Sequence, residues 1–464
     1  MVSGKKPNII LITIDSLRPD YLGCYGSSYN TSPNIDKLAK DSVVFKKCYS
    51  PFYGTDPVHT TILTGLWPET HGIIHHGPRV NKREIVKFTI KIKAENRTLP
   101  QILNKLGYRT LAIDWLGRWY RQLFIYYSGL LKNKARDKVE SYYRFLIQKL
   151  PFPSQVFYSL FKALPLDINV HAYDSAKSVI NHAIRLIRNV KEPFFLFIHL
   201  WDTHTPYDPP LRYTKRFRYI KTKYNIRVED LLNRIPDKNF KEYMKLCTYG
   251  ARYTDEIIQR YLGAISYIDD ELGQLMNFLK QTGLYDNSLI IIASDHGELL
   301  GEHGIYFDHH AHFEEVLRCV LIIKFPYSEY AGTVVRNSKA CLVDITPTIL
   351  EYLNIKIGFG FDGISIKSLI EMDNHGGISR EIFFGIDAEE ISGVRRGIIA
   401  DEWKYSMSFT PIRPCKRCGI VHHFAEELFN IEKDPCETIN LVNEEQMIAK
   451  KLRSRILKYY RGNI

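Results

Sequence analysis

The sequence predicts an α/β protein built on a mostly parallel sheet, because runs of branched apolar residues recur at the length of buried strands. One run spans residues 8–14, another residues 194–200 and a third residues 289–293. Helix signals stand between them. A cap residue, a proline and apolar periodicity follow in order over residues 31–39, and residues 254–279 have the apolar spacing of a long helix.

The length of the chain exceeds what one hydrophobic core usually fills, so we expect a large domain and a smaller one. Of its 464 residues, 45% are hydrophobic and 25% are charged, so disorder does not dominate. The formal charge of +12 favours anionic partners: phosphate or sulfate esters, nucleic acid or an anionic membrane surface. Net charge does not choose among these, and no feature specifically indicates nucleic acid.

The cysteines and the first residues predict a cytoplasmic protein. The eight cysteines are scattered and several lie inside apolar runs, which fits reduced thiols better than a disulfide framework. The N-terminal residues lead directly into a strand-like run without a small-residue cleavage site, so we expect no signal peptide. No stretch of eighteen apolar residues occurs, so we expect no membrane-spanning helix.

Acidic residues follow two of the predicted strands, at the edge of the sheet where α/β proteins bind ligands. Asp15 follows the first strand, and Asp295 with His296 follows the run at residues 289–293. A carboxylate beside an imidazole is a plausible half of a divalent-metal site. A helix cap or a capping turn explains each group equally well on these residues alone.

Thr55 stands in a turn that opens a helix, and Pro57 suits a first helical position. An alkoxide at this place would be stabilised by the helix dipole and by a neighbouring metal. A threonine before a helix is far more often a cap than a nucleophile, so this position by itself leaves both roles open.

The order of these pieces resembles the sulfatase family of the alkaline phosphatase superfamily, from the first strand to the tail. The resemblance implies an alkaline-phosphatase-like fold: a central mixed, mostly parallel sheet flanked by helices, with a smaller C-terminal α+β subdomain. It also implies a divalent metal, with Ca, Mg, Mn and Zn all open. The matching segments are residues 7–15, 31–38, 55–65, 98–110, 204–207, 267–270, 294–304 and 427–441, and the implied ligands are Asp15, Thr55, Asp295 and His296.

The chain departs from the family at the nucleophile. Sulfatases place a cysteine, later oxidised to formylglycine, two residues before the proline and an arginine two residues after it, where this chain has Thr55 and His59. Threonine cannot become the aldehyde hydrate that expels sulfate by elimination. A threonine ester must be cleaved by water or an acceptor, which favours phosphoryl chemistry, as in the superfamily's phosphodiesterases and phosphotransferases that use threonine.

Histidines stand where the family places basic residues that hold the anion. His204 matches the family's substrate-contacting histidine, and residues 308–315 replace a segment that usually carries a lysine. We expect catalytic histidines to stabilise the charge of the transferred group and to protonate the leaving group. The catalytic candidates are His59, His204 and His309, and the substrate-binding alternates are His310 and His312.

Two polar residues close to the predicted strand 194–200 are harder to assign. Asp202 is a candidate for substrate binding or for a second metal, and capping is its simpler role. His199 lies inside the apolar run and is expected to be a satisfied core histidine.

Residues 1–376 are predicted to form the catalytic domain, and residues 377–464 a small subdomain with an antiparallel sheet and a terminal helix. An insertion at about residues 115–164 interleaves aromatic and basic residues, with helical spacing over residues 136–150. A basic amphipathic helix can lie on an anionic membrane or cover a substrate, although packing on its own domain is the common case.

The C-terminal subdomain contains Cys415 and Cys418, followed by His422 and His423. This spacing is typical of zinc ligands, but zinc motifs usually contain a second clear pair of cysteines or histidines, so the motif is incomplete. A structural zinc at Cys415 and Cys418 is therefore one alternative.

These observations together predict a metal-dependent hydrolase or transferase of phosphate or sulfate esters, with Thr55 as the metal-activated nucleophile and phosphoryl chemistry favoured. A sulfuric ester hydrolase without formylglycine is the alternative, and a non-catalytic anion-binding homologue is a further one. The expected partner is an anionic ester substrate, with peripheral contact to a membrane or lipid left open. The sequence does not indicate an oligomeric state.

Overall fold

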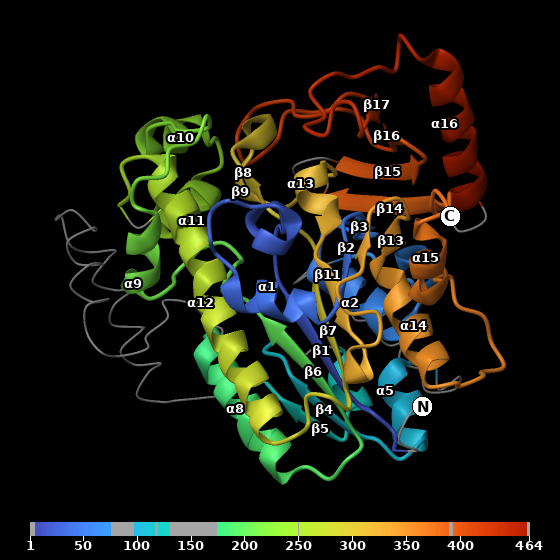
Figure 1. Ribbon diagram of the computed structural model, residues 1–464. Helices are drawn as coiled ribbons and strands as arrows, with labels where there is room; N and C mark the ends of the chain where they lie inside the picture. Colours follow the sequence, from blue (N-terminus) through green and yellow to red (C-terminus); the bar gives the residue numbers. More distant parts are fainter. Residues whose placement is uncertain are drawn as a thin grey trace.

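The structure, a computed structural model, describes residues 5–75, 97–116, 119–129, 174–248, 250–388 and 393–461. Its central sheet has eight strands: β1 (Asn8–Ile14), β2 (Val43–Phe45), β4 (Arg109–Ile113), β5 (Tyr126–Ser128), β6 (Phe194–Leu200), β7 (Ser288–Ser294), β11 (Leu321–Lys324) and β12 (Val334–Val335). Their order is β12-β2-β11-β7-β1-β6-β4-β5 (Figure 1). Only β11 among them runs antiparallel to its neighbours. The predicted mixed, mostly parallel sheet is therefore confirmed.

The three central strands β1, β6 and β7 are buried along their whole length. In β1, Ile9 and Leu11 belong to the hydrophobic core on one face of the sheet, whereas Ile10 and Ile12 belong to the core on the other face. Side chains alternate between the faces of a strand, so a strand covered on both sides must be apolar at every position.

Helices cover both faces of the sheet (Figure 1). One face carries α1 (Pro33–Lys40), α8 (Ala176–Asn189) and α12 (Thr254–Gln281), and the other carries α2 (Thr55–Thr64), α5 (Leu99–Lys105), α14 (Ile345–Tyr352) and α15 (Ile366–Asp373). The helices predicted near residues 31–39 and 254–279 are confirmed as α1 and α12.

Shorter elements connect this framework. The helices among them are α3 (Pro68–His71), α9 (Leu211–Thr214), α10 (Val228–Arg234), α11 (Lys238–Thr248) and α13 (Glu314–Leu317). The short strands are β3 (Cys48–Tyr49), β10 (Arg318–Cys319) and β13 (Ala340–Cys341), which form a three-stranded sheet, and β8 (Leu299–Leu300) and β9 (Tyr306–Asp308), which form a hairpin.

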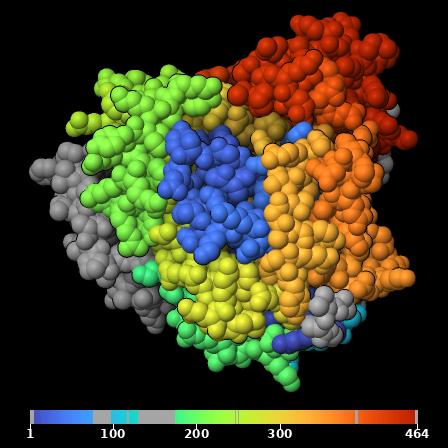
Figure 2. All heavy atoms as spheres, viewed as in Figure 1, coloured from blue at the N-terminus to red at the C-terminus, as the bar shows by residue number. Residues whose placement is uncertain are grey.

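The C-terminal part forms a separate antiparallel sheet with a helix packed on it. The strands are β14 (Glu381–Ala388), β15 (Gly393–Ala400), β16 (Trp403–Ser408) and β17 (Glu426–Asn430), and the helix is α16 (Gln446–Arg461). A small core that includes Tyr405, Leu428 and Ile456 joins them. Figures 1 and 2 show this part in red at one end of the molecule. The antiparallel subdomain is confirmed, and its boundary at residues 376 and 377 stays a prediction.

The segment predicted to form a basic amphipathic helix, residues 136–150, lies outside the described residues. The described part of that insertion contains β5, which pairs with β4 at the edge of the central sheet. Among the helices that the structure describes, none combines the length and the apolar character needed to cross a bilayer.

Candidate active site

The candidate site lies where β1, β7, β6 and β4 end. Asp15 follows β1, Asp295 follows β7 and Asp114 follows β4. Because these strands are parallel and adjacent in the sheet, their carboxyl ends meet at one edge. Helix α2 begins beside them at Thr55. The sheet order therefore brings together residues that are up to 280 positions apart.

Asp15, Asp295 and His296 form a fully buried group whose ligand atoms all lie within 4.8 Å of one another. His296 Nε2 is 3.6 Å from Asp15 Oδ1 and 3.5 Å from Asp295 Oδ2. Its other ring nitrogen, Nδ1, donates to the Gly297 carbonyl at 2.9 Å, which directs the Nε2 lone pair into the group. Asp295 Oδ2 and His296 Nε2 are buried without a hydrogen-bond partner, as expected of atoms that bind a cation. The residues therefore fit a divalent metal.

The two carboxylates differ in their pKa values. Burial opposes ionisation of Asp15, but His204, followed by His199 and His296, outweighs burial and holds the pKa of Asp15 well below its ordinary value. Burial, and then the charge of Asp15, raises the pKa of Asp295. Two anions at this separation in a buried site repel each other, and a bound divalent cation would offset that repulsion.

Ser16 joins these two carboxylates from an unusual backbone conformation, with φ of 56°. Its amide donates to Asp295 Oδ1 at 3.2 Å and its hydroxyl donates to Asp15 Oδ1 at 2.9 Å. A serine in the left-handed region costs of order 1–3 kcal/mol, and such strain is concentrated at functional sites. Ser16 thus fixes one oxygen of each carboxylate.

Thr55 is the first residue of α2 and is 1% exposed. Its hydroxyl donates to Asp15 Oδ2 at 3.2 Å. The partial positive charge of the helix N-terminus favours an anion at this position. The structure thus places the predicted nucleophile next to the predicted metal ligands.

A second buried group consists of His59, His199 and Asp295, again with ligand atoms within 4.8 Å of one another. The rings of the two histidines are 4.4 Å apart, and the Nε2 atom of each is buried without a hydrogen-bond partner. Burial lowers the pKa of His59 to about 3, so its imidazole is neutral at pH 7. His59 therefore lies in the site as predicted, but as a lone-pair donor and not as a cation.

His199 and Asp114 are site residues that the sequence interpretation missed. His199 Nδ1 is 2.8 Å from Asp114 Oδ1, and His199 Nε2 is 3.7 Å from Asp15 Oδ2. Against burial, the hydrogen bond to Asp114 and then the nearby Asp15 carboxylate raise the pKa of His199 to about 9. We expected both ring nitrogens of His199 to have hydrogen-bond partners, and this was wrong for Nε2. The available signal was the acidic residue at the end of β4, the same signal that identified Asp15.

His204 and His309 face the metal group from two different loops. The His309 ring is 4.3 Å from the His296 ring and 5.2 Å from the His204 ring. His310 follows, with its ring 4.6 Å from that of His309. Its Nδ1 donates to Asp308. Four of the predicted site histidines follow β6 or β9. The structure brings three of them together: His204, His309 and His310.

The fourth histidine and Asp202 lie in other contacts. His312 Nε2 is 3.0 Å from Glu427 Oε2, in a buried network with Arg395 of the C-terminal sheet. Asp202 Oδ2 accepts a hydrogen bond from the Ala176 amide at the start of α8, which is the capping role. The contacts of these atoms do not support the substrate-binding role predicted for His312 and Asp202.

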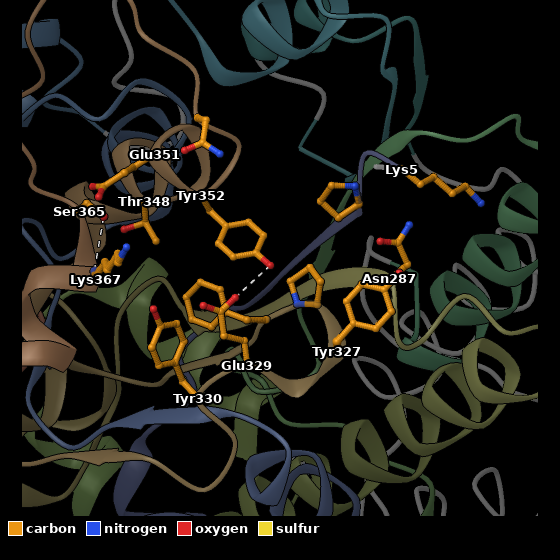
Figure 3. A pocket seen from close by; sticks show the side chains of 14 residues that line it. Lys5, Asn287, Tyr327, Glu329, Tyr330, Thr348, Glu351, Tyr352, Ser365 and Lys367 are labelled. Carbon is orange, nitrogen blue, oxygen red and sulfur yellow. Dashed lines mark hydrogen bonds between the residues drawn. The ribbon is translucent and has the colours of Figure 1, made fainter. Parts of the chain in front are cut away.

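A cavity of about 500 Å³ lies at the opposite end of the sheet (Figure 3). Its lining includes Pro7 and Asn287, which precede β1 and β7, together with Tyr327 and Tyr352. A seven-residue strand spans roughly 20 Å, so the length of the central strands separates this cavity from Asp15 and Thr55. It therefore takes no part in the site.

Comparison with known families agrees with this geometry. A family model described as Sulfatase matches residues 7–355. The chain belongs to the sulfatase family. A second model, described as the C-terminal part of N-sulphoglucosamine sulphohydrolase, matches residues 301–461.

This sulfatase-family chain is 25% identical to an arylsulfatase of Clostridium perfringens, over 99% of the chain and 97% of the relative. It is 23% identical to a multifunctional alkaline phosphatase superfamily protein of Trinickia caryophylli, over 96% and 93%.

Solved structures share the fold of this sulfatase-family chain. A protein in complex with its substrate D-glucosamine-2-N,6-O-disulfate has a TM-score of 0.70 at 20% identity, with 99% of each chain covered. The phosphonate monoester hydrolase of Agrobacterium radiobacter has a TM-score of 0.70 at 19% identity, covering 99% of this chain and 96% of that one. The predicted fold is confirmed, and the family makes the chain an ester hydrolase. Sulfatases in general use a divalent metal ion.

Proposed function

We propose that this chain is a metal-dependent hydrolase or transferase of anionic esters in which Thr55 is the nucleophile. The observation that carries the proposal is the contact between the Thr55 hydroxyl and Asp15, at 3.2 Å, beside the unpaired atoms of Asp295 and His296. A hydroxyl at a helix N-terminus, next to a group that fits a divalent cation, has the surroundings that nucleophilic catalysis requires.

Asp15, Asp295 and His296 would hold the metal, with Thr55 Oγ1 as a further ligand. A bound divalent cation lowers the pKa of a hydroxyl beside it and withdraws charge from the ester oxygens. Carboxylate, imidazole and hydroxyl donors suit several divalent ions, so Ca, Mg, Mn and Zn remain candidates.

Phosphoryl transfer is the favoured reaction, because threonine cannot form the aldehyde hydrate. A multifunctional alkaline phosphatase superfamily protein among the relatives and a phosphonate monoester hydrolase among the similar structures support this choice. A sulfate ester is the second candidate substrate, favoured by the family itself and by the arylsulfatase relative.

In the first step, a bond forms from Thr55 Oγ1 to phosphorus as the bond from phosphorus to the leaving oxygen breaks. The hydroxyl proton of Thr55 passes to solvent, and the leaving oxygen takes a proton from an imidazole. In the second step, a water or an acceptor hydroxyl gives its proton to that imidazole and forms a bond to phosphorus as the bond from phosphorus to Thr55 Oγ1 breaks. Oγ1 takes a proton from solvent, which regenerates the Thr55 hydroxyl. The second nucleophile decides between a hydrolase and a transferase.

His204 and His309 are the candidates for protonating the leaving oxygen. Their rings lie 5.2 Å apart at the open side of the metal group, and His309 is next to His296. Proton transfer from a positioned imidazole typically contributes 10²–10⁴-fold to a rate. His310 adjoins His309 and would contact the anion from the same loop.

His59, His199 and Asp295 form a second group of ligand atoms, so the site could hold two metal ions. Two buried Nε2 atoms without partners and a shared carboxylate would hold a second cation beside Thr55. The Asp114 carboxylate behind His199 is the type of partner that orients a ligating imidazole. We expect His59→Gln to lower the metal content by one equivalent per chain, measured by elemental analysis.

A panel of aryl sulfate, phosphate monoester, phosphodiester and phosphonate substrates tests the reaction class. Thr55→Ala should reduce turnover of the preferred substrate by roughly a thousandfold or more, because it removes the hydroxyl that forms the covalent ester. Mass spectrometry of quenched wild-type enzyme should find the transferred group on the peptide that contains Thr55.

Thr64→Ala is the matched control. It removes a buried threonine hydroxyl from the same helix, where Thr64 Oγ1 donates to the Thr60 carbonyl at 2.7 Å. This variant should retain activity. Full activity in Thr55→Ala would show that the nucleophile has been assigned wrongly.

A further inference from the structure

The segment Cys415–His422, named here the knuckle loop, brings three metal-ligating side chains together outside the catalytic site. Cys415 Sγ, Cys418 Sγ and a ring nitrogen of His422 lie within 4.8 Å of one another. Cys415 is buried, and both cysteines are free thiols. The sequence pattern of two cysteines three positions apart is thus completed in space by a histidine four positions further on.

The backbone of the knuckle loop is folded around the first sulfur. The Arg417 amide donates to Cys415 Sγ at 3.3 Å, and the Gly419 amide donates to the Cys415 carbonyl at 2.8 Å. Gly419 has φ of 75°, a conformation that glycine adopts without strain. An amide that donates to a cysteine sulfur stabilises the thiolate, which is the form that binds metals.

The histidine is oriented by a contact on its far side. His422 Nδ1 donates to the His303 carbonyl at 3.3 Å, and Nε2 points at Cys418 Sγ, 2.7 Å away. A ligating histidine almost always donates its other ring nitrogen to a carbonyl or carboxylate, which fixes the tautomer. The His303 carbonyl therefore presents the lone pair of His422 to the two sulfurs.

We propose that Cys415, Cys418 and His422 bind a zinc ion, with a water as the fourth ligand. Thiolate and imidazole are the donor set that selects zinc, whereas the catalytic group offers carboxylate oxygens and imidazole. A water completes the tetrahedron because Cys418 and His422 are only half-buried. This site is separate from the metal centre at Asp15.

The zinc would fix the position of Arg417, which lies between the two cysteines. The Arg417 guanidinium pairs with Asp308 Oδ2 and packs on the Phe240 ring at 4.8 Å. Asp308 in turn accepts hydrogen bonds from the amide and the Nδ1 atom of His310. Arg417 is thus a positioning residue: it holds the end of β9, from which His309 and His310 enter the catalytic site.

Cobalt substitution tests the zinc site without reference to catalysis. Reduced wild-type protein is stripped of metal and loaded with Co²⁺, and its near-ultraviolet absorption is recorded. Cobalt bound to cysteine gives an intense thiolate-to-metal charge-transfer band, which a site of carboxylates and imidazoles cannot give. We expect this band in the wild type, and Zn²⁺ should abolish it by displacing the cobalt.

Cys418→Ser and His422→Gln should weaken or remove the band, and Cys436→Ser is the control. Cys436 is an exposed free cysteine in the same subdomain and should leave the band unchanged. The proposal is overturned if reduced wild-type protein shows no charge-transfer band. It is also overturned if protein purified without reductant has two thiols fewer than expected and Cys418→Ser abolishes that difference, because the pair would then be a disulfide.

The positioning role of Arg417 needs a separate readout. Arg417→Gln should keep the cobalt band, because the ligands are intact, but should lower kcat roughly tenfold with little change in KM. Arg417→Lys keeps a cation facing Asp308 and should restore part of the kcat. Loss of the cobalt band in Arg417→Gln, or an unchanged kcat, would contradict this role.

Discussion

His199 carries a buried positive charge when the catalytic site holds no metal. The Asp114 carboxylate, 2.8 Å from Nδ1, raises the pKa of His199 to about 9, well above the ordinary value of 6.5. The folded state therefore binds this proton more tightly than the unfolded state does. The stabilisation is complete below pH 6.5 and is lost as the pH rises through about 9.

Asp114→Asn should reduce this pH dependence, because Asp114 is the first of the two carboxylates that raise the pKa of His199. A difference between pKa values of 6.5 and about 9 corresponds to roughly 3 kcal/mol of unfolding free energy. In metal-free wild-type protein, the unfolding free energy should fall between pH 6.5 and 9.5, and in the variant it should fall less, because only Asp15 then raises the pKa of His199. Chemical denaturation at several pH values measures both curves.

Tyr127→Phe is the control for this comparison. The Tyr127 hydroxyl donates to Asp114 Oδ2 at 2.5 Å, so the variant removes a neighbour of Asp114 but keeps the carboxylate. It should retain the fall at alkaline pH. A flat wild-type curve would show that His199 is neutral in the folded protein.

The residues that could be predicted from the sequence are those at the carboxyl ends of strands. Asp15 and Asp295 stand directly after apolar runs, and parallel pairing then forces them together. The apolar run around His199 predicts a core residue, and only Asp114, the acidic residue at the end of β4, indicates its role. His312 was misleading because sequence proximity to His309 says nothing about which subdomain a side chain faces.

At the scale of an element, the β8–β9 hairpin, which leads into His309, contains two glycines with positive φ. Gly301 has φ of 131°, and a Cβ atom there would lie 2.6 Å from Tyr224 Cβ. Gly304, in the same turn, has φ of 72° and no atom within 4 Å of its Cβ position. Both glycines have a positive φ, but only Gly301 lacks space for a side chain.

Gly301→Ala should therefore cost much more stability than Gly304→Ala. Strain and overlap together should lower the unfolding free energy by roughly 2–4 kcal/mol at Gly301, whereas strain alone should lower it by about 1 kcal/mol at Gly304. Denaturant titration measures the difference. Activity should follow the same order, since β9 leads into His309. Equal losses at both positions would mean that the turn relaxes around Tyr224.

The long elements of the fold could be predicted from sequence periodicity, and the short ones could not. Strands β1 and β6 occupy the predicted ranges, because an apolar run of seven residues has few other stable solutions in a covered sheet. Strands β8 and β9 have two and three residues, too few to show a period. Their described contacts come from distant segments: the Tyr306 hydroxyl donates to the Tyr224 carbonyl at 3.2 Å, and Asp308 pairs with Arg417.

At the scale of the whole molecule, a buried network joins the catalytic part to the C-terminal sheet. Glu427 pairs with Arg395 at 2.6 Å and also faces His312 and His423. Burial lowers the pKa of both histidines well below 6.5, with the charge of Arg395 acting in the same direction. The Glu427 carboxylate is already paired with Arg395, so a protonated histidine beside it would be a buried charge without a counter-ion.

The stability of the protein should consequently fall in mild acid. Below pH 6.5 the unfolded chain binds protons at these histidines and the folded chain does not, so each contributes a loss of up to about 1.4 kcal/mol per pH unit. His312→Gln should reduce the slope of unfolding free energy between pH 6.5 and 5. His375→Gln, at an exposed position, should leave the slope unchanged. An identical slope in His312→Gln would show that this histidine is charged in the folded protein.

The pairing of Arg417 with Asp308 links the loop of His309 to a segment that is synthesised late. Translation releases Asp15, Thr55, Asp295 and His296 well before Arg417. Domains generally fold as they are synthesised, N-terminal parts first. A nascent chain can thus assemble its metal ligands while the loop of His309 still lacks its guanidinium support. On the proposed mechanism, metal loading would precede turnover, and Thr55 would stay inactive until Arg417 pairs with Asp308 at the end of β9.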